Sequence, residues 1–148
     1  MLKDQFVGTW KLVSAEFRRS DGEFAYPYGE APSGVVIYDA QGHMAVQIMG
    51  SDRPSFASDD EQNGTFDELK AAFGKYGAYF GTYTVDEAQG RVIHHVQGSL
   101  FPNWVGGDQI RYFQFDGNRL TLKSPPILDG GSNLTGTLVW ERMIPTRS

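Results

Sequence analysis

Glycines divide the chain into short runs of β-branched and aromatic residues, and this pattern limits the folds open to it. Eighteen glycines occur among the 148 residues. They recur at roughly the spacing of about ten residues that separates turns in small all-β proteins. The pattern predicts eight strands, approximately at Gly8–Arg18, Gly34–Asp39, His43–Met49, Tyr79–Asp86, Arg91–Gly98, Asp108–Asp116, Arg119–Ser124 and Thr135–Arg142.

The connections between these strands alternate in length. Those at 40–42, 87–90 and 117–118 are tight turns, whereas those at 19–33, 50–78, 99–107 and 125–134 are long. Successive connections of an up-and-down sheet lie at opposite ends, so all the long loops gather at one end, the mouth. An eight-stranded barrel is about wide enough to hold one small ligand. We therefore expect an antiparallel up-and-down barrel of eight to ten strands.

One short helix is expected between the third and fourth of these strands. Thr65 has the character of an N-cap, acidic residues follow it, and apolar residues then recur at helical spacing as far as Tyr76.

Composition excludes several classes of function. The formal net charge of −5 and the lack of a basic run argue against nucleic acid and anionic membranes as partners. The absence of cysteine excludes disulfides, thiol catalysis and cysteine-ligated metals. The polar N-terminal residues lack the apolar stretch of a secretory signal, which favours a cytoplasmic location. With 40% hydrophobic residues, the chain is expected to form one domain over residues 1–148.

Several segments resemble a known family. Gly8-Thr9-Trp10 matches the Gly-x-Trp signature of lipocalins, and Arg142 matches the arginine that packs on that tryptophan. Together with segments 39–47, 79–83, 94–99 and 101–104, they resemble the stand-alone lipocalin-like domain proteins of bacteria and fungi. The resemblance implies a calycin-type barrel with Trp10 and Arg142 at the closed end. It also implies an association of some members with natural-product pathways.

Hairpin geometry proposes which side chains face the lumen. Pairing Asp86 with Arg91 places Tyr83 opposite His94 on one face, and pairing around 117–118 turns Arg111 inward. The first strand would send Ser14 and Glu16 inward above an apolar floor that includes Val35 and Ile37. The expected ligand contacts are Ser14, Glu16, Tyr79, Tyr83, His94, Phe101, Asn103, Trp104, Gln109, Arg111 and Phe113.

The inward charges allow more than one interpretation. A buried Arg111 needs a partner, which is Glu16 in a structural ion pair, a carbonyl or carboxylate of a ligand, or water. A nearby arginine keeps His94 neutral. His94 is then either a general base beside Tyr83 or an ordinary hydrogen-bonded core histidine. His94 and His95 point to opposite faces of a strand, so no metal site is expected, and no cofactor motif is present.

Three functions remain open. The first is binding of a small, largely apolar or amphiphilic molecule in the cavity by a monomer or homodimer. The second is a cofactor-independent isomerase, cyclase or hydratase for a natural-product-like substrate, with His94, Tyr83, Glu16 and Arg111 as catalytic groups. The third is a barrel that is filled by its own side chains and acts through its surface.

Overall fold

The strands close into a barrel. The computed structural model describes residues 2–145. Its elements are α1 (Leu2–Phe6), β1 (Gly8–Arg19), β2 (Phe24–Ala25), β3 (Ser33–Tyr38), β4 (His43–Met49), α2 (Phe66–Gly74), β5 (Tyr76–Asp86), β6 (Arg91–Ser99), the 3-10 helix η1 (Pro102–Trp104), β7 (Asp108–Asp116), β8 (Arg119–Lys123), β9 (Ile127–Asp129) and β10 (Ser132–Arg142).

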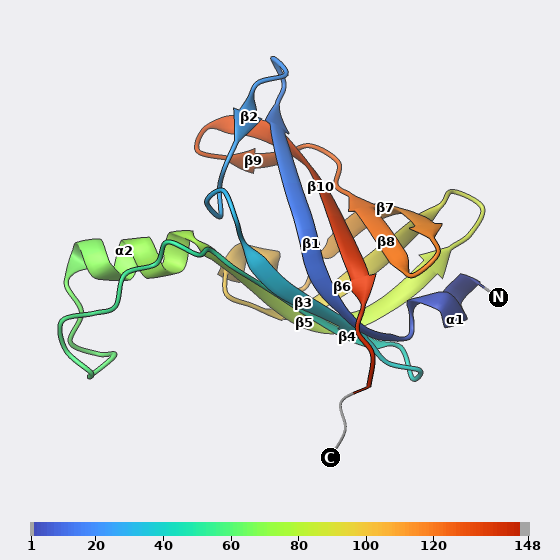
Figure 1. Ribbon diagram of the computed structural model, residues 1–148, viewed down its shortest axis with the longest axis horizontal. Coiled ribbons are helices and arrows are strands. Elements are labelled where there is room, and N and C mark those ends of the chain that lie inside the picture. The colour runs from blue at the N-terminus through green and yellow to red at the C-terminus, as the bar shows by residue number, and fades with distance from the viewer. Residues whose placement is uncertain (1, 146–148) are drawn as a thin grey trace.

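Each long strand pairs with the next one along the chain. The order β1-β3-β4-β5-β6-β7-β8-β10 is antiparallel throughout, and β10 pairs back onto β1, so eight of the ten strands form a closed ring (Figure 1). The short strands β2 and β9 extend β1 and β10 at the mouth. The all-β, eight-stranded antiparallel barrel expected from the sequence is confirmed.

The position of the helix in the strand order needs a correction. It was expected after the third strand, but α2 follows the fourth, β4. The reason is that the two-residue strand β2, which was not predicted, adds one strand before it. The helix also ends earlier, at Gly74, because Tyr76 already pairs with Met49 as part of β5. Its predicted start is confirmed: the Thr65 side chain accepts from the Glu68 N–H, and the Glu68 side chain accepts from the Thr65 N–H.

A β-bulge in β1 reverses the expected direction of its side chains. Leu12 pairs with Trp140 and Ser14 with Val139, so Val13 is an extra residue on β1. Because a bulge shifts the alternation by one residue, Phe17 points inward, whereas Ser14 and Glu16 point outward. The prediction that Ser14 and Glu16 face the lumen is therefore wrong.

The inward face of β3 is also displaced by one residue from the prediction. Val36 and Tyr38 are buried, whereas Val35 is only partly covered and Ile37 is 43% exposed. The register with β4 explains this. Tyr38 pairs with Met44 and Val36 with Val46, and both β4 partners are buried.

The N-terminal helix α1 plugs the closed end. Phe6 is fully buried, and its ring meets those of Tyr38, Phe113 and Phe115 edge-on at centroid distances of 5.2, 5.0 and 4.9 Å. The Phe6 carbonyl accepts a hydrogen bond from Trp10 Nε1 at 2.9 Å. This end of the lumen is therefore packed solid with aromatic side chains.

The expected contact of Arg142 with Trp10 is present at the closed end. The guanidinium carbon lies 4.2 Å from the centre of the Trp10 ring, and the guanidinium donates to the carbonyls of Val7 and Gln5 at 2.6 and 2.5 Å. Gly8 has a φ of 141°, and a Cβ there would lie 2.7 Å from Arg142 Nη1. The glycine of the Gly-x-Trp motif thus leaves the space that the arginine uses.

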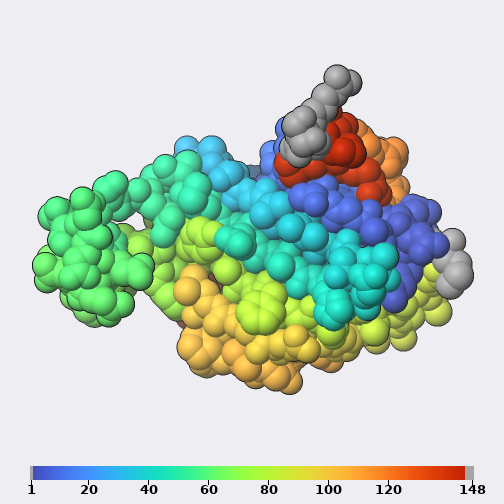
Figure 2. Space-filling model, turned by 90° about the horizontal axis from the view of Figure 1, so that it is seen from below, coloured from blue at the N-terminus to red at the C-terminus, as the bar shows by residue number. Residues whose placement is uncertain are grey.

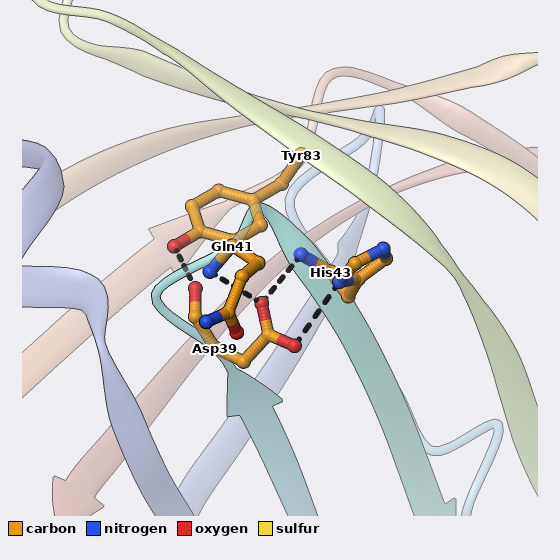
Figure 3. A network of polar contacts seen from close by, with 4 residues as sticks. All are labelled: Asp39, Gln41, His43 and Tyr83. Carbon is orange, nitrogen blue, oxygen red and sulfur yellow. Dashed lines mark hydrogen bonds and ion pairs between the residues drawn. The ribbon is translucent and has the colours of Figure 1, made fainter.

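A hydrogen-bonded turn joins β3 to β4 at the same end. The Asp39 carboxylate accepts from the backbone N–H groups of Gln41 and His43 and contacts His43 Nδ1 at 3.1 Å (Figure 3). The hydroxyl of Tyr83 donates to the Asp39 carbonyl at 2.7 Å. Tyr83 therefore ties β5 to the turn.

The long connections lie at the opposite end, where α2 projects from the barrel. No residue of α2 is buried, and its segment stands out from the body of the molecule (Figures 1 and 2). Arg53 donates to the carbonyl of Ala72 at 3.3 Å, and Lys75 contacts Asp52 at 2.5 Å. These contacts join the C-terminal end of the helix to the residues that follow β4. Within residues 2–145 no helix has the length and hydropathy to cross a membrane.

Candidate ligand cavity

A cavity of about 470 Å³ occupies the mouth half of the barrel. All eight strands of the ring contribute to its wall, and most of the wall is apolar. The inward wall residues are Phe17, Val36, Val46, Ile48, Gly77, Tyr79, His94, Arg111, Leu122, Ser124, Leu134, Gly136, Leu138 and Trp140. Residues of the long connections, including their short elements α2, η1 and β9, form its rim. Among them are Pro27, Tyr28, Phe73, Phe101, Trp104, Ile127 and Leu128.

Two features of the sequence keep this space open. Gly136 lies on the inward face of β10, and a Cβ there would approach the Phe17 ring to 2.7 Å. Gly77 at the start of β5 leaves room in the same way for the ring of Tyr28. Toward the closed end the lumen is filled by Phe6 and the aromatic residues that pack on it.

His94 lies between two tyrosines in the wall of the cavity. Its Nε2 is 2.6 Å from the hydroxyl of Tyr38, and its Nδ1 is 2.7 Å from the hydroxyl of Tyr79. His94 is 2% exposed, and both tyrosines are buried as well. Tyr79 and His94 line the cavity, whereas Tyr38 lies behind them, against Phe6. We refer to these three residues as the Tyr38–His94–Tyr79 network.

Burial keeps the network uncharged. Desolvation, followed by the nearby positive charge of Arg111, lowers the pKa of His94 well below its ordinary value of 6.5. Desolvation also raises the pKa of Tyr79, and raises that of Tyr38 well above the ordinary 10.0. The imidazole is therefore neutral at pH 7, as the sequence led us to expect, with burial as the larger cause.

Arg111 brings a guanidinium group to the cavity wall. Its guanidinium donates to the carbonyl of Ile110 at 2.8 Å and makes a long contact of 3.4 Å with Gln109 Oε1. Among the ion pairs of residues 2–145, none includes Arg111. Asp129 at the rim is the acidic residue that also lines the cavity. The remaining N–H donors of the Arg111 guanidinium are thus available to a ligand in the lumen.

The structure brings five of the expected contact residues together. Tyr79, His94, Phe101, Trp104 and Arg111 all line the cavity. Trp104 meets Tyr79 edge-on at 6.0 Å and Phe101 at 5.5 Å, so the two aromatic residues of the η1 loop cover the side where the network lies. The roles assigned to these five residues stay predictions.

The other expected contacts lie elsewhere. Glu16 is outside the barrel, where its carboxylate pairs with Arg18 at 2.8 Å. The alternative in which Glu16 forms an ion pair with Arg111 is therefore wrong. Ser14 and Asn103 are exposed. Gln109 supports Arg111 but is not in the cavity wall, and Phe113 packs on Phe6 at the closed end.

Tyr83 needs a correction of its own. It pairs with His94 across β5 and β6 as expected, but its hydroxyl bonds to the Asp39 carbonyl. The hydrogen-bonding partners of His94 are Tyr38 and Tyr79. The tyrosine that lies beside His94 in the cavity wall is therefore Tyr79 and not Tyr83. His95 faces outward, as expected, and contacts Asp108 at 2.8 Å.

Sequence reasoning missed Tyr38 and Phe17. The position of Tyr38 could have been found from the tight turn at 39–42, which pairs Tyr38 with Met44. Phe17 points inward only because of the bulge at Val13, and neither glycine nor proline marks that bulge in the sequence. No group of three or more potential metal-ligating side chains gathers within the part of the chain that the structure describes.

Two solved structures align with nearly the whole chain at low similarity. The "REP1-NXSQ fatty acid transporter" covers 97% of this chain and 99% of its own, with a TM-score of 0.44 and 12% identity. A redesigned β-barrel, mFAP1, bound to DFHBI covers 95% of this chain and 97% of its own, with a TM-score of 0.40 and 17% identity.

The sequence comparisons are more specific. A curated protein of Aspergillus oryzae, the 4′-hydroxy-3′-methoxypropiophenone carrier protein ppsC, is 32% identical over 107 residues. The alignment covers 68% of this chain and 96% of that protein. The family described as the lipocalin-like domain matches residues 7–143. This match spans the whole barrel from β1 to the end of β10, and the chain belongs to the lipocalin-like domain family.

Proposed function

We propose that the protein binds one small, largely apolar aromatic molecule inside the barrel and carries it. The observation that supports this most is the cavity itself, whose volume of about 470 Å³ lies within the ~300–1,000 Å³ typical of small-molecule sites. Its wall is apolar and aromatic, with a few polar groups on one side. Such a wall stabilises a hydrophobic ligand by removing it from water and orients it through a small number of hydrogen bonds.

The relative from Aspergillus oryzae supports an aromatic ketone as the kind of ligand. That protein is named as a carrier of a methoxylated hydroxypropiophenone. A molecule of this kind combines a flat ring, which suits the aromatic residues Phe17, Tyr28 and Trp104, with a carbonyl group. Arg111 and Tyr79 lie on the wall of the same cavity and can meet that oxygen.

The geometry gives less support to the isomerase, cyclase or hydratase considered from the sequence. Both ring nitrogens of His94 already have a tyrosine partner, so His94 has no free nitrogen to take a proton from a substrate directly. Glu16 is outside the barrel, and Tyr83 is bonded to the turn at the closed end. The proposed function is therefore binding. The cytoplasmic location of the protein and its monomeric or dimeric state stay predictions from the sequence.

Tryptophan substitutions on two walls of the cavity, combined with a measurement of ligand binding, test this proposal. We expect the propiophenone named for the relative to bind wild-type protein with one molecule per chain in isothermal titration calorimetry. Ile48→Trp together with Leu138→Trp places two indoles in the lumen and should weaken binding at least tenfold, because the ligand then competes with them for space.

A matched control uses the outer face of the same barrel. Ile37→Trp together with Val13→Trp adds the same two indoles at positions that are 43% and 41% exposed. This variant should bind like wild type. Equal weakening in both double variants, or no binding of the ketone or of any similar aromatic molecule to wild type, would show that the cavity is not the binding site.

A further inference from the structure

The Tyr38–His94–Tyr79 network must distribute three protons over two hydrogen bonds. A neutral imidazole carries one N–H, and each tyrosine carries one O–H. Each short contact with His94 uses one of these protons. One hydroxyl proton is therefore left over, and the surroundings of the two tyrosines decide where it lies.

In the first arrangement the imidazole proton is on Nε2. Nε2–H then donates to the Tyr38 oxygen, and the Tyr79 hydroxyl donates to Nδ1. The leftover proton belongs to Tyr38, which is 1% exposed and has no acceptor besides His94 among the hydrogen bonds of residues 2–145. A buried donor without a partner is strongly unfavourable.

In the second arrangement the imidazole proton is on Nδ1. Tyr38 then donates to Nε2, and Nδ1–H donates to the Tyr79 oxygen. The leftover proton belongs to Tyr79, whose side chain lines the cavity and can reach water or a ligand. Once water or a ligand accepts this proton, every polar group of the network is satisfied, so the second arrangement has the lower free energy.

We infer that the network fixes Tyr79 as a hydrogen-bond donor into the cavity and thereby selects ligands with a carbonyl oxygen at the network side. Arg111 on the same wall adds to this polarity, because a guanidinium has donors and no acceptor. Tyr79 and Arg111 both present hydrogen-bond donors beside His94. They therefore favour a ligand with an acceptor oxygen, such as that of a ketone or aldehyde. This inference rests on the proposed function for its ligand and deepens it by naming the ligand atom that is recognised.

Tyr38 acts in this scheme as a positioning residue. It does not line the cavity, but its hydroxyl determines which nitrogen of His94 carries the proton. Without that hydroxyl, Nε2 lacks a partner in both tautomers, so the preference for Nδ1–H becomes weaker. In the share of molecules with Nε2–H, Tyr79 turns its proton back to Nδ1. Tyr38→Phe should therefore change ligand selectivity from behind the cavity wall.

The tautomer can be measured without any ligand. Nitrogen-15 NMR of the imidazole in wild-type protein should show Nδ1 as the protonated, pyrrole-type nitrogen and Nε2 as the pyridine-type nitrogen. Tyr38→Phe should increase the share of the opposite tautomer. Protonated Nε2 in the wild type would overturn the inference, and this result would leave the proposed binding function intact.

Selectivity is measured with two probes of the same carbon skeleton, propiophenone and propylbenzene. Tyr79→Phe should weaken propiophenone roughly three- to tenfold, the range of one hydrogen bond, and leave propylbenzene unchanged. Tyr38→Phe should weaken propiophenone in the same direction. Tyr112→Phe removes the hydroxyl of an outward tyrosine that is 46% exposed, and it should change neither affinity.

The outcomes separate the two proposals. If both probes bind wild type and Tyr79→Phe changes their affinities equally or not at all, the carbonyl recognition is wrong and the cavity remains the binding site. If neither probe binds wild type, the proposed function fails together with the inference built on it.

Discussion

At the scale of single residues, the cavity depends on polar side chains whose charge is set by burial. His94 stays neutral because it is desolvated, and Arg111 reinforces that state. The guanidinium of Arg111 lies in the wall and lacks a carboxylate partner among the described ion pairs. A neutral imidazole that bridges two hydroxyls, beside a guanidinium, gives the otherwise apolar cavity one polar side.

The depressed pKa of His94 predicts a pH dependence of stability. In the unfolded chain His94 regains its ordinary pKa of 6.5, so below that pH the unfolded state binds a proton that the folded state does not. The free energy of unfolding should then fall on acidification, by at most about 1.4 kcal/mol per pH unit from this residue. Urea unfolding between about pH 7.5 and 5.5 measures the slope.

Two variants isolate the contribution of His94 to that slope. His94→Gln should flatten the slope in this range, whereas His95→Gln, which changes a partly exposed histidine, should leave most of it. Carboxylates such as Asp39, whose pKa is lowered from 3.8 mainly by the His43 N–H, lose their contribution only at lower pH. The same slope in wild type and in His94→Gln would contradict a buried neutral histidine.

At the scale of elements, hairpins could be predicted from the sequence and irregularities could not. Pairing across the turns at 87–90 and 117–118 correctly turned His94 and Arg111 inward, because the register is regular from each turn as far as these residues. The irregularity in the first hairpin, at 80–81, lies beyond His94. In β1 the bulge at Val13 reversed the alternation and moved Ser14 and Glu16 outside. The alternation of inward and outward side chains along a strand can be followed only as far as the next bulge. The side-chain directions were therefore predicted better on the network side of the cavity than on the β1 side.

The helix α1 and its role at the closed end were not predicted from the sequence. Five residues are too few to show a helical period, and the sequence predicted no element before Gly8. Its one buried residue, Phe6, nevertheless closes the barrel.

We expect Phe6→Ala to lower the free energy of unfolding by about 3–5 kcal/mol, because it empties a packed aromatic site. Phe66→Ala is the matched control, since Phe66 begins α2 and is 77% exposed. That variant should stay within about 0.5 kcal/mol of wild type. Urea unfolding compares the two, and similar losses in both variants would contradict the role of Phe6 as the plug.

At the scale of the whole molecule, the barrel has two unlike ends. Tight turns, α1 and the Trp10–Arg142 contact form the closed end, and the long connections surround the cavity. The alternation of short and long connections predicted this arrangement, because it follows from chain direction alone in an up-and-down sheet. The depth of the lumen could not be predicted, since it depends on how far Phe6 and its neighbours fill the barrel from below.

The central claim is that an aromatic molecule binds between the strands, above this plug. The most direct test is a crystal structure of the wild-type protein grown with 4′-bromopropiophenone, in which the anomalous signal of bromine locates the ligand. The account predicts a bromine peak inside the barrel, within the space bounded by Phe17, Ile48 and Leu138. A peak on the outer face of the sheet, or a lumen without bound ligand at saturating concentration, would contradict it.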